Sequence, residues 1–408
     1  MAPAESPTEP SSASASSKPA TGPELQLTIE MLAPPQCIAQ DTEGKLHGWL
    51  DIAQRYVRTY VKLIVAPDSQ DGITEALAGS VLKDMRGDIK GNVCTLYQIG
   101  CAGESSSHPH LRVPSFRGAD HLRMYMAAWA ALRGDADALQ DGDLHLIADG
   151  GKRGLEQTFH SCFKKGSDNR AMEKNHHIIM LTYTEDSVAQ RRVLNRGATT
   201  LDQCEILHVF SKCPIALEHK KRRHYSGSNY GNVMGPIALP KWDDLWMVDV
   251  QHKKDLLGKS GKILASNGLD KNLRELHTGD QSKPKFNDTM EPVNWHAIGT
   301  APYEEFVHSF SAKAICHITC FDQDCALACL LNTTHYVGFT FSTAHRDLLY
   351  AKLAKDVFSA FNADGGPLCK PSLMELMQTT EASSSMTKVS PALKKRTAKD
   401  KADKGAHP

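Results

Sequence analysis

One stretch near the C-terminus decides the fold: residues 315–340, which with the preceding alanine read AICHITCFDQDCALACLLNTTHYVGFT. An apolar run, a polar turn, a run of small residues, a short polar turn and a second apolar run follow one another. This order has the length and the pattern of a β-strand, an α-helix and a second β-strand. We therefore predict a βαβ unit whose two strands are neighbours in one sheet.

The turn after the first of these strands bears on ligand binding. In nucleotide-binding domains such a turn cradles a cofactor at the carboxyl end of the strand. Here residues 320–324 read CFDQD, without the glycine that lets a backbone approach a ligand closely. Asp322 and Asp324 would also repel an anionic ligand. The order of elements therefore indicates a cofactor domain, whereas the chemistry of the turn opposes one.

The composition is that of a globular chain without a strong overall charge. Its 408 residues fit one large domain or two ordinary ones, and 47 basic residues balance 47 acidic ones. A net charge of +0 points to no polyanionic partner for the whole molecule, so any basic site is local. The 11 cysteines fit no disulfide framework, no signal peptide precedes them, and no apolar run approaches the ~20 residues of a membrane helix. We predict an intracellular protein of a reducing compartment, cytoplasmic or nuclear, with no membrane partner.

The chain divides into four predicted segments, which differ in composition and in hydrophobic pattern. They are a disordered Ser/Ala/Pro-rich tail (1–25), a mostly helical region that packs on the core (26–139), an α/β domain (140–368) and a disordered basic tail (369–408). The basic tail is centred on Lys394, Lys395 and Arg396. Such a tail fits a nuclear-localisation signal or a nucleic-acid contact as well as a purely solubilising role.

Strand and helix patterns alternate in the predicted α/β domain. Apolar runs at 144–148, 176–183 and 206–210 predict strands, and Thr184 is placed to cap an intervening helix. Thr343 is placed to cap a last helix, whose apolar residues recur at four-residue steps. A short helix is predicted at residues 302–310. This alternation is typical of an α/β fold.

The densest basic cluster of the predicted domain lies in residues 219–235, HKKRRHYSGSNYGNVMG. Its cations could contact phosphates, and its tyrosines could stack on unpaired bases. The residues of this predicted nucleic-acid site are Lys220, Lys221, Arg222, Arg223, Tyr225 and Tyr230. An ordinary solvated loop is the alternative.

Four cysteines of the organising stretch raise the question of a metal. Cys316, Cys320, Cys325 and Cys329 lack the close Cys-x2-Cys pairs of structural zinc sites, and the last two are simply spaced one helical turn apart. We predict buried free thiols and no metal site.

Taken together, these pieces resemble the S-adenosylmethionine-dependent amino-methyltransferases with circularly permuted motif order, the β-group enzymes that methylate adenine N6 or cytosine N4. In that family a strand ending in Asp-Pro-Pro-aromatic comes early, and the cofactor strand, ending in Asp-x-Phe-x-Gly-x-Gly, comes near the C-terminus. Asp149, Gly150, Gly151 and Lys152 fall where the acceptor motif would lie, and residues 315–340 match the cofactor unit. The resemblance covers residues 140–361 and implies a Rossmann-like, methyltransferase-type sheet with helices on both faces, S-adenosylmethionine as cofactor and nucleic acid as substrate.

The departures from the family pattern fall on the functional positions. His317 occupies the place of the cofactor motif's acid, Phe321 and Gln323 replace its glycines around Asp322, and Thr340 stands where an acid would hold the ribose. At the acceptor motif Asp149 is retained, but both prolines are glycines and a lysine replaces the base-stacking aromatic residue. Glycines fix the accepting backbone less firmly, and lysine offers no stacking face.

Three functions remain open from the sequence. The favoured prediction is a catalytically degenerate methyltransferase-like protein that retains nucleic-acid or protein binding. The alternatives are an active S-adenosylmethionine-dependent methyltransferase with unusual cofactor contacts and an interaction protein that uses the α/β core as a scaffold.

Overall fold

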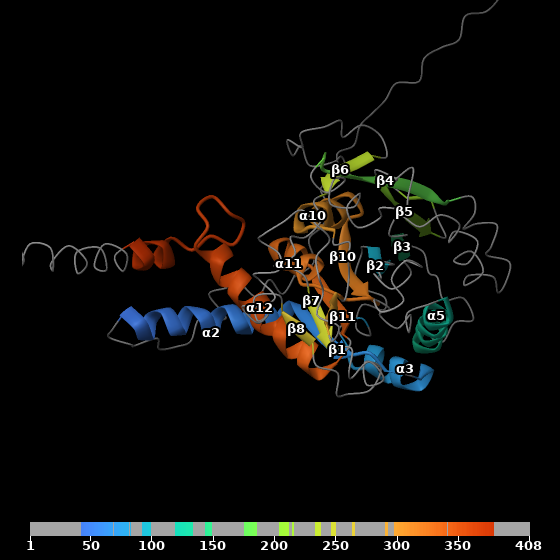
Figure 1. The fold of residues 1–408 in the computed structure, drawn as a ribbon, viewed down its shortest axis with the longest axis horizontal. Coiled ribbons are helices and arrows are strands. Elements are labelled where there is room, and N and C mark those ends of the chain that lie inside the picture. Colours follow the sequence, from blue (N-terminus) through green and yellow to red (C-terminus); the bar gives the residue numbers. More distant parts are fainter. Residues whose placement is uncertain are drawn as a thin grey trace, which may run out of the picture.

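The computed structural model describes residues 42–67, 69–80, 82, 92–98, 119–133, 143–148, 175–185, 204–211, 214–215, 233–237, 246–249, 263–265, 290–292, 298–340 and 342–378. These residues form an eight-stranded sheet, a three-stranded sheet and helices on both faces of the larger sheet (Figure 1). In chain order the elements are α2 (Thr42–Tyr60), β1 (Val61–Val65), α3 (Gln70–Ala78), β2 (Asn92–Gln98), α5 (Ala119–Arg133), β3 (Asp143–Ala148), β4 (His177–Tyr183), β5 (Cys204–Ser211), β6 (Val233–Ile237), β7 (Trp246–Asp249), β8 (Ile263–Ala265), β9 (Met290–Pro292), α10 (Thr300–Ser309), β10 (Ala312–His317), α11 (Asp324–Leu331), β11 (His335–Thr340) and α12 (Thr343–Phe361).

The larger sheet has the strand order β1-β11-β10-β2-β3-β5-β4-β6. The first five strands run parallel to one another, β5 is antiparallel to both β3 and β4, and β6 is parallel to β4. Pro236 lies on β6, which is an edge strand of this sheet. Edge strands tolerate proline, because one side of the strand forms no hydrogen bonds with a neighbouring strand. The smaller sheet is antiparallel, with the order β8-β7-β9.

The predicted βαβ unit is confirmed. β10 and β11 pair in parallel, with Ile315 opposite Tyr336 and Cys316 opposite Val337. Helix α11 connects them and ends at Asn332, and Thr333 takes a positive φ of 52° to turn the chain into β11. The two strands are central and buried on both faces, which explains why the sequence shows continuous apolar runs rather than alternation.

Two clusters of buried apolar side chains hold the helices on the sheet. On one face, residues of α2, α10, α11 and α12 pack against the strands. On the other, residues of α3 and α5 pack against β2, β10 and β11. Figure 1 shows α3 and α5 on the opposite side of the sheet from α10, α11 and α12. The α/β, Rossmann-like architecture predicted from the sequence is therefore confirmed.

The region predicted as mostly helical, residues 26–139, also supplies two strands. α2, α3 and α5 are helices as expected, but β1 and β2 enter the parallel part of the sheet beside β11 and β10. The prediction missed β1 because the helical spacing of apolar residues continues through Tyr60 into Val61, with no turn residue between helix and strand. The N-terminal region thus forms part of the sheet rather than packing on it as a separate helical unit.

Two details at the C-terminus also differ from the prediction. Ser342, not Thr343, caps α12, since its hydroxyl accepts the backbone N–H of His345. The core also extends past the predicted boundary at residue 368, because residues 371–378 are helical and Leu373 is fully buried. Pro371 suits a first helical position, and Leu373, Leu376 and Met377 recur at helical spacing.

Candidate functional site

The strand order has a switch point between β10 and β2. From β10 the chain passes through α11, on one face of the sheet, to β11. The neighbouring strand β2 pairs with β3, and α5, which lies between them in the chain, covers the opposite face. In open α/β sheets the strands diverge at such a switch point, and ligands bind outside their carboxyl ends. The turn that follows β10 therefore lies at the position where this class of fold binds its ligands.

That turn is closed by hydrogen bonds among its own residues. One carboxylate oxygen of Asp322 accepts the backbone N–H of Asp324, 3.1 Å away, at the start of α11. The carboxylate of Asp324 accepts the Thr300 hydroxyl at 3.0 Å and the Gln323 amide at 3.2 Å. A carboxyl oxygen of the protein thus already occupies a donor that a ligand's anionic group would use at this helix start.

Burial changes the charge of this turn. Asp322 is 8% exposed. Burial and the nearby Asp324 raise the pKa of Asp322 to about 8, although the hydrogen bond from Asp324 N–H and the charge of Lys352 act in the opposite direction. The predicted repulsion of an anion by two charged aspartates is thus reduced at neutral pH, where Asp322 is largely protonated.

Phe321 fills space at the position where the resembling family has a glycine. Its side chain is 1% exposed and belongs to the core cluster shared with α11 and α12. Its carbonyl oxygen accepts a hydrogen bond from Nε2 of His345, 3.0 Å away. His345 is itself fixed by the capping contact with Ser342. The backbone of the turn is therefore hydrogen-bonded to α12, and the buried Phe321 side chain packs in the core beneath the turn.

The two remaining residues of the predicted cofactor site, His317 and Thr340, are both buried. His317 is buried, and its Nδ1 lies 2.9 Å from the Tyr336 hydroxyl on the neighbouring strand. Thr340 is 0% exposed, and its hydroxyl donates to the carbonyl oxygen of Ile64 on β1 at 3.2 Å. Both side chains are engaged in contacts between neighbouring strands.

Tyr303 of α10, which no sequence pattern singles out, is fully buried and close enough to Asp322 for the two to interact electrostatically. Burial, with contributions from Asp322 and from Glu205 on β5, raises its pKa well above the ordinary value. Glu205 also accepts the Tyr183 hydroxyl of β4. Thr300, Tyr303 and His345 were missed because their contacts with the turn join segments that are distant in the sequence.

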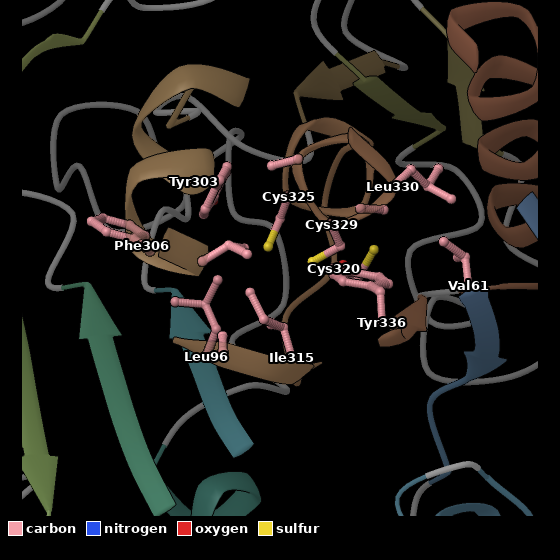
Figure 2. Close-up of a cluster of buried hydrophobic side chains, with 14 of the residues drawn as sticks. Val61, Leu96, Tyr303, Phe306, Ile315, Cys320, Cys325, Cys329, Leu330 and Tyr336 are labelled. Carbon is pink, nitrogen blue, oxygen red and sulfur yellow. The ribbon is translucent and has the colours of Figure 1, made fainter. Parts of the chain in front are cut away.

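The thiols of the organising stretch are buried and free, as predicted. Cys320, Cys325 and Cys329 lie in one core cluster and Cys316 in the other. Figure 2 shows the sulfur atoms of Cys325 and Cys329 on the side of α11 that faces the sheet, near Cys320. Burial raises the pKa of Cys316 to about 12 and that of Cys325 well above its usual value, so both are protonated thiols. Among the residues that the structure describes, no group of three His, Cys, Asp or Glu side chains is arranged to hold a metal ion.

The predicted acceptor and nucleic-acid residues lie outside the described ranges. These residues are Asp149, Gly150, Gly151, Lys152, Lys220, Lys221, Arg222, Arg223, Tyr225 and Tyr230. The strand order is still relevant to Asp149, Gly150, Gly151 and Lys152. These residues follow β3 in the sequence, and β2 lies between β3 and β10 in the sheet. The strand beside β10 is therefore β2, and β3, which precedes the predicted acceptor residues, lies one strand further away.

No model of a known protein family matches this chain, and no curated protein matches it either. Among solved structures, the complex of M1.HpyAVI with SAM is 9% identical, covers 72% of this chain and 98% of its own, and has a TM-score of 0.35. The PvuII DNA methyltransferase, cytosine-N4-specific, is 9% identical, covers 74% of this chain and 93% of its own, and has a TM-score of 0.34. These scores are too low to carry an argument about function.

None of the helices in the described part of the chain combines the length and apolar character needed to cross a membrane.

Proposed function

We propose that this protein is a methyltransferase-like α/β protein that transfers no methyl group and acts by binding a partner, with nucleic acid as the favoured class. The observation that carries the proposal is the closed turn after β10. Asp322 occupies the Asp324 N–H, and buried Phe321 stands where a ligand would need open backbone. Since catalysis in such a fold needs the cofactor at this place, a filled turn argues for loss of the chemistry.

We expect no binding of S-adenosylmethionine to the full chain by calorimetric titration or by thermal unfolding. A ligand with a Kd near ~10 μM would add about 2.7 kcal/mol of stability at about 1 mM, which a thermal scan detects readily. S-adenosylhomocysteine provides a second ligand in the same assay. Micromolar binding that disappears in Asp149→Ala or Gly150→Leu would refute the proposal, because it would place the cofactor beside the predicted acceptor residues.

One observation favours the alternative of an active methyltransferase that modifies nucleic acid. The switch point between β10 and β2 is at the ligand position of this class of fold, and the raised pKa of Asp322 is of the kind found at functional sites. In that case the cofactor would have to displace the Asp322 contact with Asp324 N–H. Methyl transfer from labelled S-adenosylmethionine to DNA or RNA distinguishes this candidate from the first.

The proposed nucleic-acid contact is the basic cluster Lys220, Lys221, Arg222 and Arg223, with Tyr225 and Tyr230. Four adjacent cations would supply salt-dependent phosphate contacts, and the phenol rings would stack on bases. Against a net charge of +0, such a cluster acts at short range only.

Replacing all four cations with alanine is expected to weaken binding of single-stranded DNA and RNA and to flatten its salt dependence. With ~0.7 per phosphate contact, the log–log slope should fall by about 3 units. The matched control is alanine at Lys394, Lys395 and Arg396, which tests the C-terminal cluster in the same way. Unchanged affinity in the first variant, or absence of binding by the unmodified protein, would reject the cluster as the nucleic-acid site.

A further inference from the structure

Three histidines from neighbouring segments lie on the face of the larger sheet that α5 covers. His145 of β3 pairs opposite Phe210 of β5, and Phe210 belongs to the core cluster shared with α5. His208 lies two residues before Phe210, and therefore on the same face of β5. His176 directly precedes β4 and stacks on the Phe210 ring. His145 and His208 are 2% and 1% exposed, whereas His176 is only partly buried.

The rings of His176 and His208 are in direct contact. Nε2 of His176 lies 3.1 Å from Nδ1 of His208, so one of these nitrogens donates a hydrogen bond to the other. The His176 ring is also stacked on Phe210, with 4.4 Å between the ring centres and 9° between the planes. His177, the next residue, is the first residue of β4 that pairs with β5. The contact therefore fastens the beginning of β4 to β5.

The number of protons on the pair decides whether this contact can exist. When both rings are neutral, the N–H of one ring donates to the unprotonated nitrogen of the other. One additional proton keeps the hydrogen bond and makes it charge-assisted. This charge is best placed on His176, which is the more exposed ring and lies over the face of Phe210. A second proton puts an N–H on both facing nitrogens and two like charges side by side, so the rings must separate.

The neighbouring side chains cannot neutralise two positive charges. Among the side chains that the structure describes, the other titratable groups on this face are Asp143 and His145 of β3, Cys204 of β5 and Tyr125 of α5. Asp143 is the one carboxyl group of this set, and it is buried. His145 adds a third imidazole, a group that takes up protons between about pH 5 and 8. Glu205 and His177 lie on the opposite face of their strands.

We infer that the His176–His208 pair is an acid-operated latch, which holds the beginning of β4 on β5 at neutral pH and opens when both rings carry a charge. The closed pair holds at most one additional proton, whereas the open rings hold two. Acid therefore favours the open form, and each pH unit changes the ratio of open to closed latch by at most about tenfold per proton taken up. Opening separates His176 from Phe210 and releases the first residues of β4 from the sheet.

Hydrogen exchange of the full chain at about pH 7.5 and about pH 5.5 tests the latch, because imidazoles take up protons in this range. After correction for the intrinsic pH dependence of exchange, we expect the protection of the amides of residues 177–179 to fall ~10- to 100-fold at the lower pH. The amides of α12, on the other face of the sheet, should change by less than ~2-fold. Equal protection of β4 at both pH values would overturn the inference. An equal loss in α12 would also overturn it, because it would indicate global unfolding.

His208→Asn separates the titration of this ring from other effects of acid. The asparagine carbonyl oxygen can accept a hydrogen bond where Nδ1 of His208 lies, but it takes up no proton. In this variant we expect β4 to keep its protection at both pH values. The matched control is His177→Asn, which removes the adjacent exposed imidazole and should retain the acid-induced loss. A loss that persists in His208→Asn, or that disappears in His177→Asn, would reject the latch.

One further measurement needs no variant and decides the matter even where His208→Asn does not fold. An NMR titration of the histidine rings in the unmodified protein reports the charge of His208 directly. We expect His208 to become charged over the same pH range in which the β4 amides lose protection. A His208 ring that takes up its proton while these amides remain protected would contradict the inference.

Discussion

Replacing Gly338 with alanine is expected to lower the free energy of unfolding by ~1–3 kcal/mol, the range found for overpacked cores. A Cβ atom at this position would lie 2.6 Å from Tyr336 Cε1, 3.0 Å from Leu63 Cδ2 and 3.1 Å from Cys320 Sγ. All three neighbours are themselves buried, so none can move away freely. Urea unfolding followed by circular dichroism measures the loss.

Gly338 also matters to the candidate site. Because Gly338 has no side chain, the Tyr336 ring can lie close to the backbone of β11, and the Tyr336 hydroxyl lies within hydrogen-bonding distance of His317. The Cys320 thiol, at the start of the turn, occupies the same space beside Gly338. The control is Gly79→Ala, where the nearest atom to an added Cβ is the Glu75 carbonyl oxygen at an ordinary 3.5 Å. We expect that variant to change the stability by no more than ~0.5 kcal/mol. Equal losses in the two variants would show that close packing at Gly338 is not the cause.

The sequence predicted those elements whose pattern is local. β10, α11 and β11 were recognisable because two apolar runs flank a segment of small residues, and short turns separate all three. The same holds for β3, β4 and β5, whose apolar runs are continuous. For such elements, hydrophobic pattern and turn residues agree with the final fold.

What the sequence could not predict depends on contacts between distant segments. The position of β2 between β10 and β3 is fixed by pairing across more than two hundred residues of chain, as in the register of Leu96 with His317. The acceptor assignment at Asp149 rested on chain order, and it did not anticipate this intervening strand. The Tyr350 contact with β1 and the His345 contact with Phe321 likewise leave no periodic signal in the sequence.

The turn after β10 shows a second limit of reading residues by type. Asp322 and Asp324 are both acidic in the sequence, but burial makes them unequal. Their roles also differ: Asp322 accepts the backbone N–H of Asp324, whereas the Asp324 carboxylate receives Thr300 and Gln323. Charge at this turn is thus set by the environment rather than by composition.

This inequality makes stability depend on pH in a defined direction. The folded protein holds the Asp322 proton up to a pKa of about 8, whereas the unfolded chain releases it near the ordinary aspartate pKa of 3.8. Between these values the folded state binds more protons, so the contribution of Asp322 to stability falls as the pH rises. The slope is at most ~1.4 kcal/mol per pH unit, and the contribution is complete below the lower pKa and lost above the upper one.

Asp322→Asn is therefore expected to flatten the dependence of stability on pH between about 4 and 8, and to stabilise the protein most at the alkaline end. The amide oxygen of asparagine can still accept the Asp324 N–H, so the turn keeps its hydrogen bond while losing the buried ionisable group. Urea unfolding at several pH values, compared between the two proteins, isolates this residue from the many other titrating groups. Asp347→Asn, which removes an exposed carboxylate of α12, serves as the control. A pH profile of Asp322→Asn parallel to that of the unmodified protein would mean that Asp322 is already ionised in the folded state, and would restore the double negative charge at the turn as the reason for excluding an anionic ligand.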